Sequence, residues 1–71
     1  MIILNMAQKQ QDVIALLEAQ EGDFTYKFVS KQGIKLKFEV TGDPQGAADN
    51  AKKLIKAQPW GAALFFNAVV A

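Results

Sequence analysis

The sequence predicts an α+β domain in which two helices pack on one face of a small antiparallel sheet. Residues 24–31 and 34–41 alternate apolar and polar side chains, which is the pattern of half-buried strands. One stretch with apolar residues at helical spacing precedes this pair of strands, and a second follows it. The chain has 71 residues, of which 51% are hydrophobic and 21% charged. We therefore expect a single domain over residues 1–71 with one modest core.

The first element expected is a short strand over residues 2–4, because IIL is apolar and rich in β-branched side chains. Asn5 follows as an N-cap candidate, with Gln8 three positions later at the spacing of a capping box. These signals predict a first helix from about Met6 to about Gln20. Its buried stripe is expected to consist of Met6, Gln10, Val13, Ile14, Leu16 and Leu17. The alternative is that the helix starts earlier and that no first strand forms.

The two alternating segments are joined by Gln32-Gly33 and predict a β-hairpin with one buried face. Glycine in this connection supplies the positive φ that tight hairpin turns require. Alternation turns one set of side chains inward, namely Phe24, Tyr26, Phe28, Ile34, Leu36, Phe38 and Val40. The outward side of the hairpin carries Val29 and four lysines, which are Lys27, Lys31, Lys35 and Lys37.

A second helix is predicted between Asp43 and Pro59. Asp43 can cap it, Pro44 suits the first helical position, and Pro59 prevents its continuation. Trp60 comes next in the chain, and we expect it to close one end of the core rather than to stand exposed as an anchor for a partner.

A last strand is predicted from Ala63 to Val70, where Asn67 is the only polar residue. With the first strand present, the elements follow the β-α-β-β-α-β order of ferredoxin-like domains on a four-stranded antiparallel sheet. Without it, the order becomes α-β-β-α-β on a three-stranded sheet. In both arrangements the two helices cover the same face.

Composition excludes several kinds of chemistry. The chain contains no cysteine and no histidine, so it has no disulfide, no thiol nucleophile, no zinc finger and no imidazole base. All eight cationic side chains are lysine, and the lack of arginine argues against sequence-specific reading of DNA. We expect no catalytic, cofactor-binding or metal-binding residues, and a protein that is not an enzyme and takes no small-molecule substrate.

The predicted last strand is apolar on both sides, whereas the helices can cover only one face of the sheet. Phe65, Asn67 and Val69 share one side of this strand, and Leu64, Phe66, Ala68 and Val70 share the other. Either set could face the helices, and the uncovered set would leave an apolar patch in water. A second chain is the simplest cover. The sequence therefore predicts a small protein-interaction module that forms a homodimer, or binds another protein, through Phe65, Asn67 and Val69, with Val29 nearby.

The outward lysines of the hairpin support an alternative function. A row of lysines on one sheet face can contact phosphate groups, which would make the protein a nucleic-acid-binding accessory or regulatory protein. The segment MIILNM has no basic n-region, and the apolar run near residue 71 is shorter than the roughly 20 residues of a membrane-spanning helix. We expect a cytoplasmic protein without membrane contact.

Overall fold

A computed structural model describes all residues from Met1 to Ala71. Two helices and four strands follow one another along the chain in the order β-α-β-β-α-β. In order, they are β1 (Ile2–Asn5), α1 (Gln10–Glu18), β2 (Tyr26–Gln32), β3 (Lys35–Val40), α2 (Pro44–Lys56) and β4 (Asn67–Val70). The first strand is therefore present, and the three-stranded alternative is not observed.

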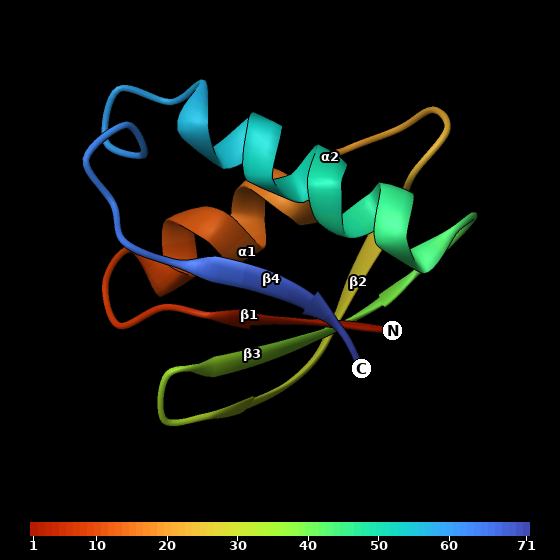
Figure 1. The fold of residues 1–71 in the computed structure, drawn as a ribbon, viewed down its shortest axis with the longest axis horizontal. Helices are drawn as coiled ribbons and strands as arrows, with labels where there is room; N and C mark the ends of the chain where they lie inside the picture. The colour runs from red at the N-terminus through yellow and green to blue at the C-terminus, as the bar shows by residue number, and fades with distance from the viewer.

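The four strands form one antiparallel sheet in the order β2-β3-β1-β4. Both helices lie on the same face of this sheet, and the other face is open (Figure 1). The α+β class and the single helical layer are as the sequence predicts. Strands β2 and β4 form the two edges of the sheet, while β1 and β3 are paired on both sides.

The core lies between the helices and the covered face of the sheet. It combines alternate residues of the central strands with alanines of α2, which allow that helix to approach the sheet closely. Trp60 is half-buried against this core, in agreement with its predicted closing role. The core residues are Ile2, Leu4, Met6, Val13, Leu17, Tyr26, Leu36, Phe38, Ala47, Ala48, Ala51, Ile55 and Ala68.

The predicted N-terminus of the first helix is wrong by four residues. Asn5 belongs to β1, where its backbone takes part in the sheet, so it cannot cap a helix. The residue that precedes α1 is Lys9, which has a φ of 61° and makes no capping bond with its side chain. Instead, the side-chain amide of Gln10 donates to the carbonyl oxygens of Met6 (2.9 Å) and Gly33 (3.0 Å). Burial of Met6 as an extension of the strand outweighs the capping-box signal.

The second helix begins as predicted. The Asp43 carboxylate accepts a hydrogen bond from the Gly46 amide at 2.8 Å, and Pro44 occupies the first helical turn. The helix ends at Lys56, shortly before Pro59. This helix lies over β1 and β4 and so fixes the face of β4 that is covered.

The last strand is shorter than predicted, because it begins at Asn67 and not at Ala63. Residues 57–66 form successive turns and a short extended loop. Within them the Gly61 amide donates to Gln58 and the Leu64 amide to Gly61. Leu64 and Phe66 pack partly against the core from this loop, so the apolar residues before Asn67 are used in packing without joining the sheet.

A β-bulge in β2 interrupts the predicted alternation. Phe28 is opposite Phe38, but Ser30 is opposite Lys37, which leaves Val29 as the extra residue. Beyond the bulge the two faces of β2 are exchanged relative to the prediction. The turn that follows is Gly33-Ile34, one residue later than expected, so Ile34 is exposed in the turn and is not directed into the core.

Candidate protein interaction surface

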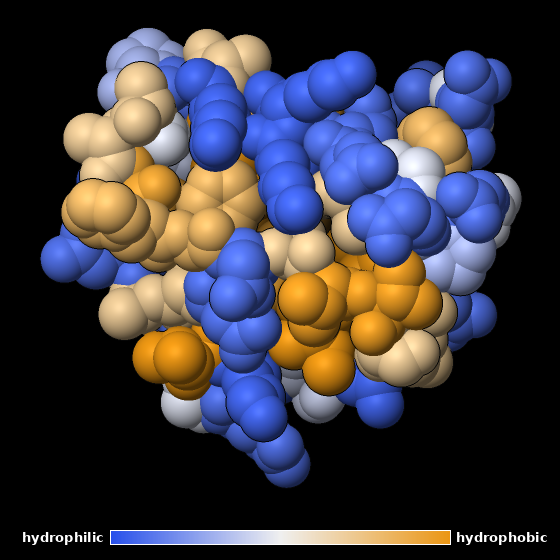
Figure 2. All heavy atoms as spheres, viewed as in Figure 1, coloured by the Kyte–Doolittle hydropathy of each residue, from blue (hydrophilic) through white to orange (hydrophobic).

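Strand β4 forms an open edge of the sheet without any charged residue. The sheet order places no strand beyond it, and Gly61–Ala71 contains no ionisable side chain. Val69 and Val70 are 45% and 44% exposed. In Figure 2 a hydrophobic patch lies over the end of β4, close to both chain termini. An uncharged edge strand is a surface to which another strand can add.

The backbone groups that β4 offers at this edge follow from two hydrogen bonds of β1. The Met6 amide donates to Ile34 (2.8 Å), and the Ala71 amide donates to Met1 (2.9 Å). Alternate residues of a strand turn their backbone groups to opposite neighbours. Even-numbered residues of β1 therefore face β3, and odd-numbered residues face β4.

The same alternation continues into β4. Asn67 and Val69 lie opposite Asn5 and Ile3, so their N–H and C=O groups are directed to β1. The N–H and C=O groups of Ala68 and Val70 consequently point away from the sheet. These four groups are the hydrogen-bonding capacity of the open edge.

The side chains of β4 divide between the two faces as the register dictates. Ala68 lies opposite Leu4 and faces the helices, where it is buried. Asn67 and Val69 lie on the open face. There the side-chain amide of Asn5 donates to the side-chain oxygen of Asn67 at 2.7 Å. Of the two sets of side chains that could face the helices, the one with Ala68 is covered, and Asn67 and Val69 lie on the open face.

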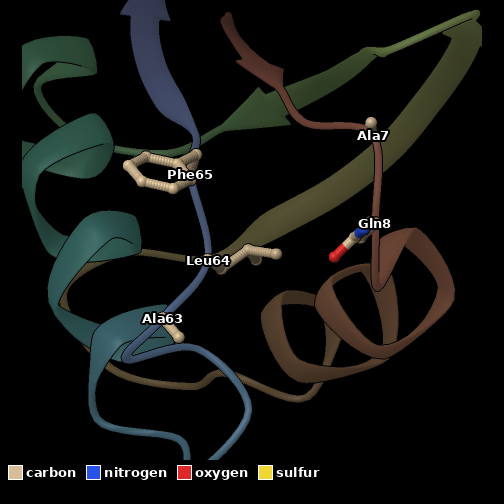
Figure 3. A pocket seen from close by; sticks show the side chains of 5 residues that line it. All are labelled: Ala7, Gln8, Ala63, Leu64 and Phe65. Atoms are coloured by element: carbon tan, nitrogen blue, oxygen red, sulfur yellow. The ribbon is translucent and has the colours of Figure 1, made fainter.

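Phe65 is separate from this strand. It lies in the loop before β4 and is 96% exposed. A hollow of about 210 Å³ is lined by Ala7, Gln8, Ala63, Leu64 and Phe65. In Figure 3 the Leu64 side chain points across this hollow toward Gln8, whereas the ring of Phe65 points to the other side of its segment. Phe65 therefore lies outside β4 and does not share a strand face with Val69.

Val29 lies far from the other predicted contact residues. It occupies β2, the opposite edge of the sheet, with β3 and β1 between it and β4. Three strand spacings amount to about 14 Å. Val29 and Val69 are equally exposed, at 45% each, but the structure does not bring them together.

The edge formed by β2 differs from β4 because it carries its own blocking groups. The Phe28 amide, directed away from β3, donates to the Glu18 carboxylate of α1 at 3.3 Å. Next to it stands the bulge at Val29, and Lys27 and Lys31 are exposed on the same strand. Bulges and lysines both prevent edge-to-edge pairing. No sequence pattern identified Glu18, since its partner is a backbone group.

The bulge also divides the predicted lysine patch. Lys31 is opposite Leu36, whose side chain is buried beneath the helices, so Lys31 belongs to the covered face. Lys27 stays on the open face opposite Glu39. Only Lys35 and Lys37 remain as an uncompensated pair on that face. They line a shallow hollow of about 170 Å³ together with Ile3, Ser30 and Gln32.

A buried polar contact ties β2 to α2. The Tyr26 hydroxyl donates to the Ala47 carbonyl oxygen at 2.7 Å and accepts from the side-chain amide of Asn50 at 3.1 Å. Burial raises the pKa of Tyr26 above its ordinary value, and the hydrogen bond from Asn50 partly offsets this. The contact is structural in character, because the hydroxyl is enclosed by its two partners.

No three acidic side chains lie close enough together to hold a metal ion, and neither helix has the length and apolarity to cross a membrane. No protein-family model matches the chain, and neither a curated protein nor a solved structure matches it.

Proposed function

We propose that this chain is a small, non-enzymatic, cytoplasmic protein-interaction module that self-associates through β4. The observation that carries the proposal is the asymmetry of the sheet edges, of which only β4 lacks blocking groups. The order of the elements and of the strands also supports classing the domain as ferredoxin-like.

Self-association has a clear physical benefit for a domain of this size. Its core is small, and without cysteine it has no disulfide to add stability. Complete burial of one valine or phenylalanine side chain contributes about 1.5–3 kcal/mol before the cost of association. Because Phe65 is 96% exposed and Val69 is 45% exposed, covering Phe65 would add nearly this full amount and covering Val69 about half of it.

The test compares two double substitutions by multi-angle light scattering. Phe65→Lys with Val69→Lys introduces charge at the β4 end, and the expected result is a folded protein of lower mass than the unmodified one. The control is Val29→Lys with Ile34→Lys, which changes two residues at the β2 side that are 45% and 52% exposed. The control should retain the mass of the unmodified protein. An unmodified protein that is monomeric at high micromolar concentration would refute the proposal.

A second candidate function is weak binding of nucleic acid at the open face. It is favoured by the pairing of Lys35 and Lys37 beside the polar side chains Ser30 and Gln32. Binding of a fluorescent single-stranded DNA at low salt should weaken in a Lys35→Glu, Lys37→Glu variant. Substitution of Lys31, which lies toward the covered face, should have less effect. Absence of binding at low ionic strength excludes this function.

A further inference from the structure

We propose that the partner at the open edge is a second copy of this chain, paired antiparallel through β4 about a two-fold axis that passes beside Val69. The inference rests on the proposed self-association and specifies its geometry. It follows from the direction of the backbone groups, the faces of the side chains and the lack of charge in β4.

The backbone groups of the open edge are self-complementary. Only Ala68 and Val70 direct their N–H and C=O groups outward, because Ala71, Val69 and Asn67 are turned to β1. In an antiparallel pair centred on Val69, Ala68 lies opposite Val70 of the partner copy. Each such pair exchanges two hydrogen bonds, and symmetry supplies two pairs. All four free groups of the observed strand are then satisfied.

The side chains are compatible with this arrangement. Val69 lies on the open face next to Ile3 of the neighbouring strand, so pairing would place Ile3, Val69, and the same two residues of the second copy in one apolar row. Lys37 follows Ile3 outward in the register and would border that row at each end. Burial at the centre with charge at the rim is the usual composition of a protein interface.

Charge favours pairing of β4 with β4 of the second copy over pairing of β4 with β2 of that copy. Two β4 strands bring no ionisable side chain together, since residues 61–71 contain none. A β2 edge would instead present Lys27 and Lys31, the bulge at Val29, and a Phe28 amide already bonded to Glu18. Pairing of β4 with β4 is therefore the arrangement that leaves the fewest groups unsatisfied.

Single cysteines provide a direct test, because the chain has no cysteine of its own. Residues directly opposite in a non-hydrogen-bonded antiparallel pair have Cα atoms about 4.5 Å apart, within the range of a disulfide. Val69→Cys should form a covalent dimer in a glutathione redox buffer. Val29→Cys is the control with equal exposure and should remain monomeric. Unfolding in urea should abolish the preference for Val69→Cys.

Two further variants separate this geometry from others. A strand pair centred one residue earlier would cross-link Ala68→Cys instead, and face-to-face stacking of the open faces would cross-link Ile3→Cys. Either result, without cross-linking of Val69→Cys, overturns the proposed axis. Sedimentation of the unmodified protein keeps the two proposals distinct. A dimer without the Val69→Cys product refutes only the geometry, whereas a monomer at high micromolar concentration refutes self-association itself.

Discussion

The two edge strands of the sheet, β2 and β4, differ in how far their outward backbone groups are blocked from pairing with another strand. Each has one side without a neighbouring strand. In β2 an outward amide is bonded to Glu18, a bulge interrupts the strand, and lysines flank the bulge. In β4 a short uncharged strand is left open. The contrast indicates that one edge is protected against pairing while the other is available for it.

The edges also differ in how they are attached to the helices. A buried hydroxyl joins Tyr26 of β2 to α2, whereas β4 is held by packing and by the turns that lead into it. Substitutions that loosen one attachment should therefore leave the other edge intact. Three such changes, from the largest expected effect to the smallest, sharpen the comparison.

The largest effect is expected at Gly61, in the turns before β4. A Cβ at this position would overlap the carbonyl group of Ile55, so Gly61→Ala forces the backbone of α2 or of the loop to move. We expect a loss of about 3 kcal/mol or more in the free energy of unfolding. The control is Gly33→Ala in the β2–β3 turn, which has open space but a φ of 59°. It should cost only about 1–2 kcal/mol. Urea denaturation measures both, and equal losses would contradict the structure.

A smaller effect is expected from Tyr26→Phe, which removes the hydroxyl between β2 and α2. The Asn50 amide and the Ala47 carbonyl each lose a partner, and the free energy of unfolding should fall by about 1 kcal/mol. The position of β4 should not change. Amide chemical shifts that change mainly in β4 would show that the two attachments are not independent.

The same residue predicts a pH dependence. Because the pKa of Tyr26 is raised in the folded protein, the unfolded chain ionises first, near the ordinary tyrosine value of about 10. The contribution of Tyr26 is thus complete below that pH and is lost as the pH rises through the pKa of the folded state. The difference in stability between the unmodified protein and Tyr26→Phe should shrink over this range. A constant difference would contradict the burial of the hydroxyl.

The smallest effect is expected from Glu18→Ala, which removes the carboxylate from the β2 edge. The loss of stability should stay below about 1 kcal/mol, since the contact is exposed and long. The Phe28 amide should exchange faster with solvent, and β2 should become more open to pairing. Glu21→Ala is the control, because this exposed residue follows the helix. Identical Phe28 exchange rates in both variants would remove Glu18 from the protection of β2.

Regular periodicity made much of the fold predictable. The hairpin follows from alternation, the second helix from helical spacing and terminal signals, and the first strand from its apolar, β-branched residues. The bulge at Val29 was not predictable, because Phe28, Val29 and Ser30 fit an uninterrupted strand equally well. A bulge is decided by pairing with β3, which no local pattern records.

The candidate site was predictable in part for the same reason. Asn67 and Val69 were correctly assigned to one side of the last strand, since β4 is regular there. Phe65 left the strand because Leu64 and Phe66 pack from a loop, a tertiary effect that outweighs β-propensity. Lys31 was assigned to the wrong face by the bulge two residues earlier.

Hydrogen exchange of individual amides, followed by NMR as the protein is concentrated from micromolar to millimolar, tests the open edge most directly. If β4 pairs with a second copy, exchange at the outward amides of Ala68 and Val70 slows as concentration rises, while that at Lys31 in β2 stays constant. Unchanged rates at Ala68 and Val70 over the whole range, or equal slowing at both edges, would contradict the assignment of β4 as the interaction surface.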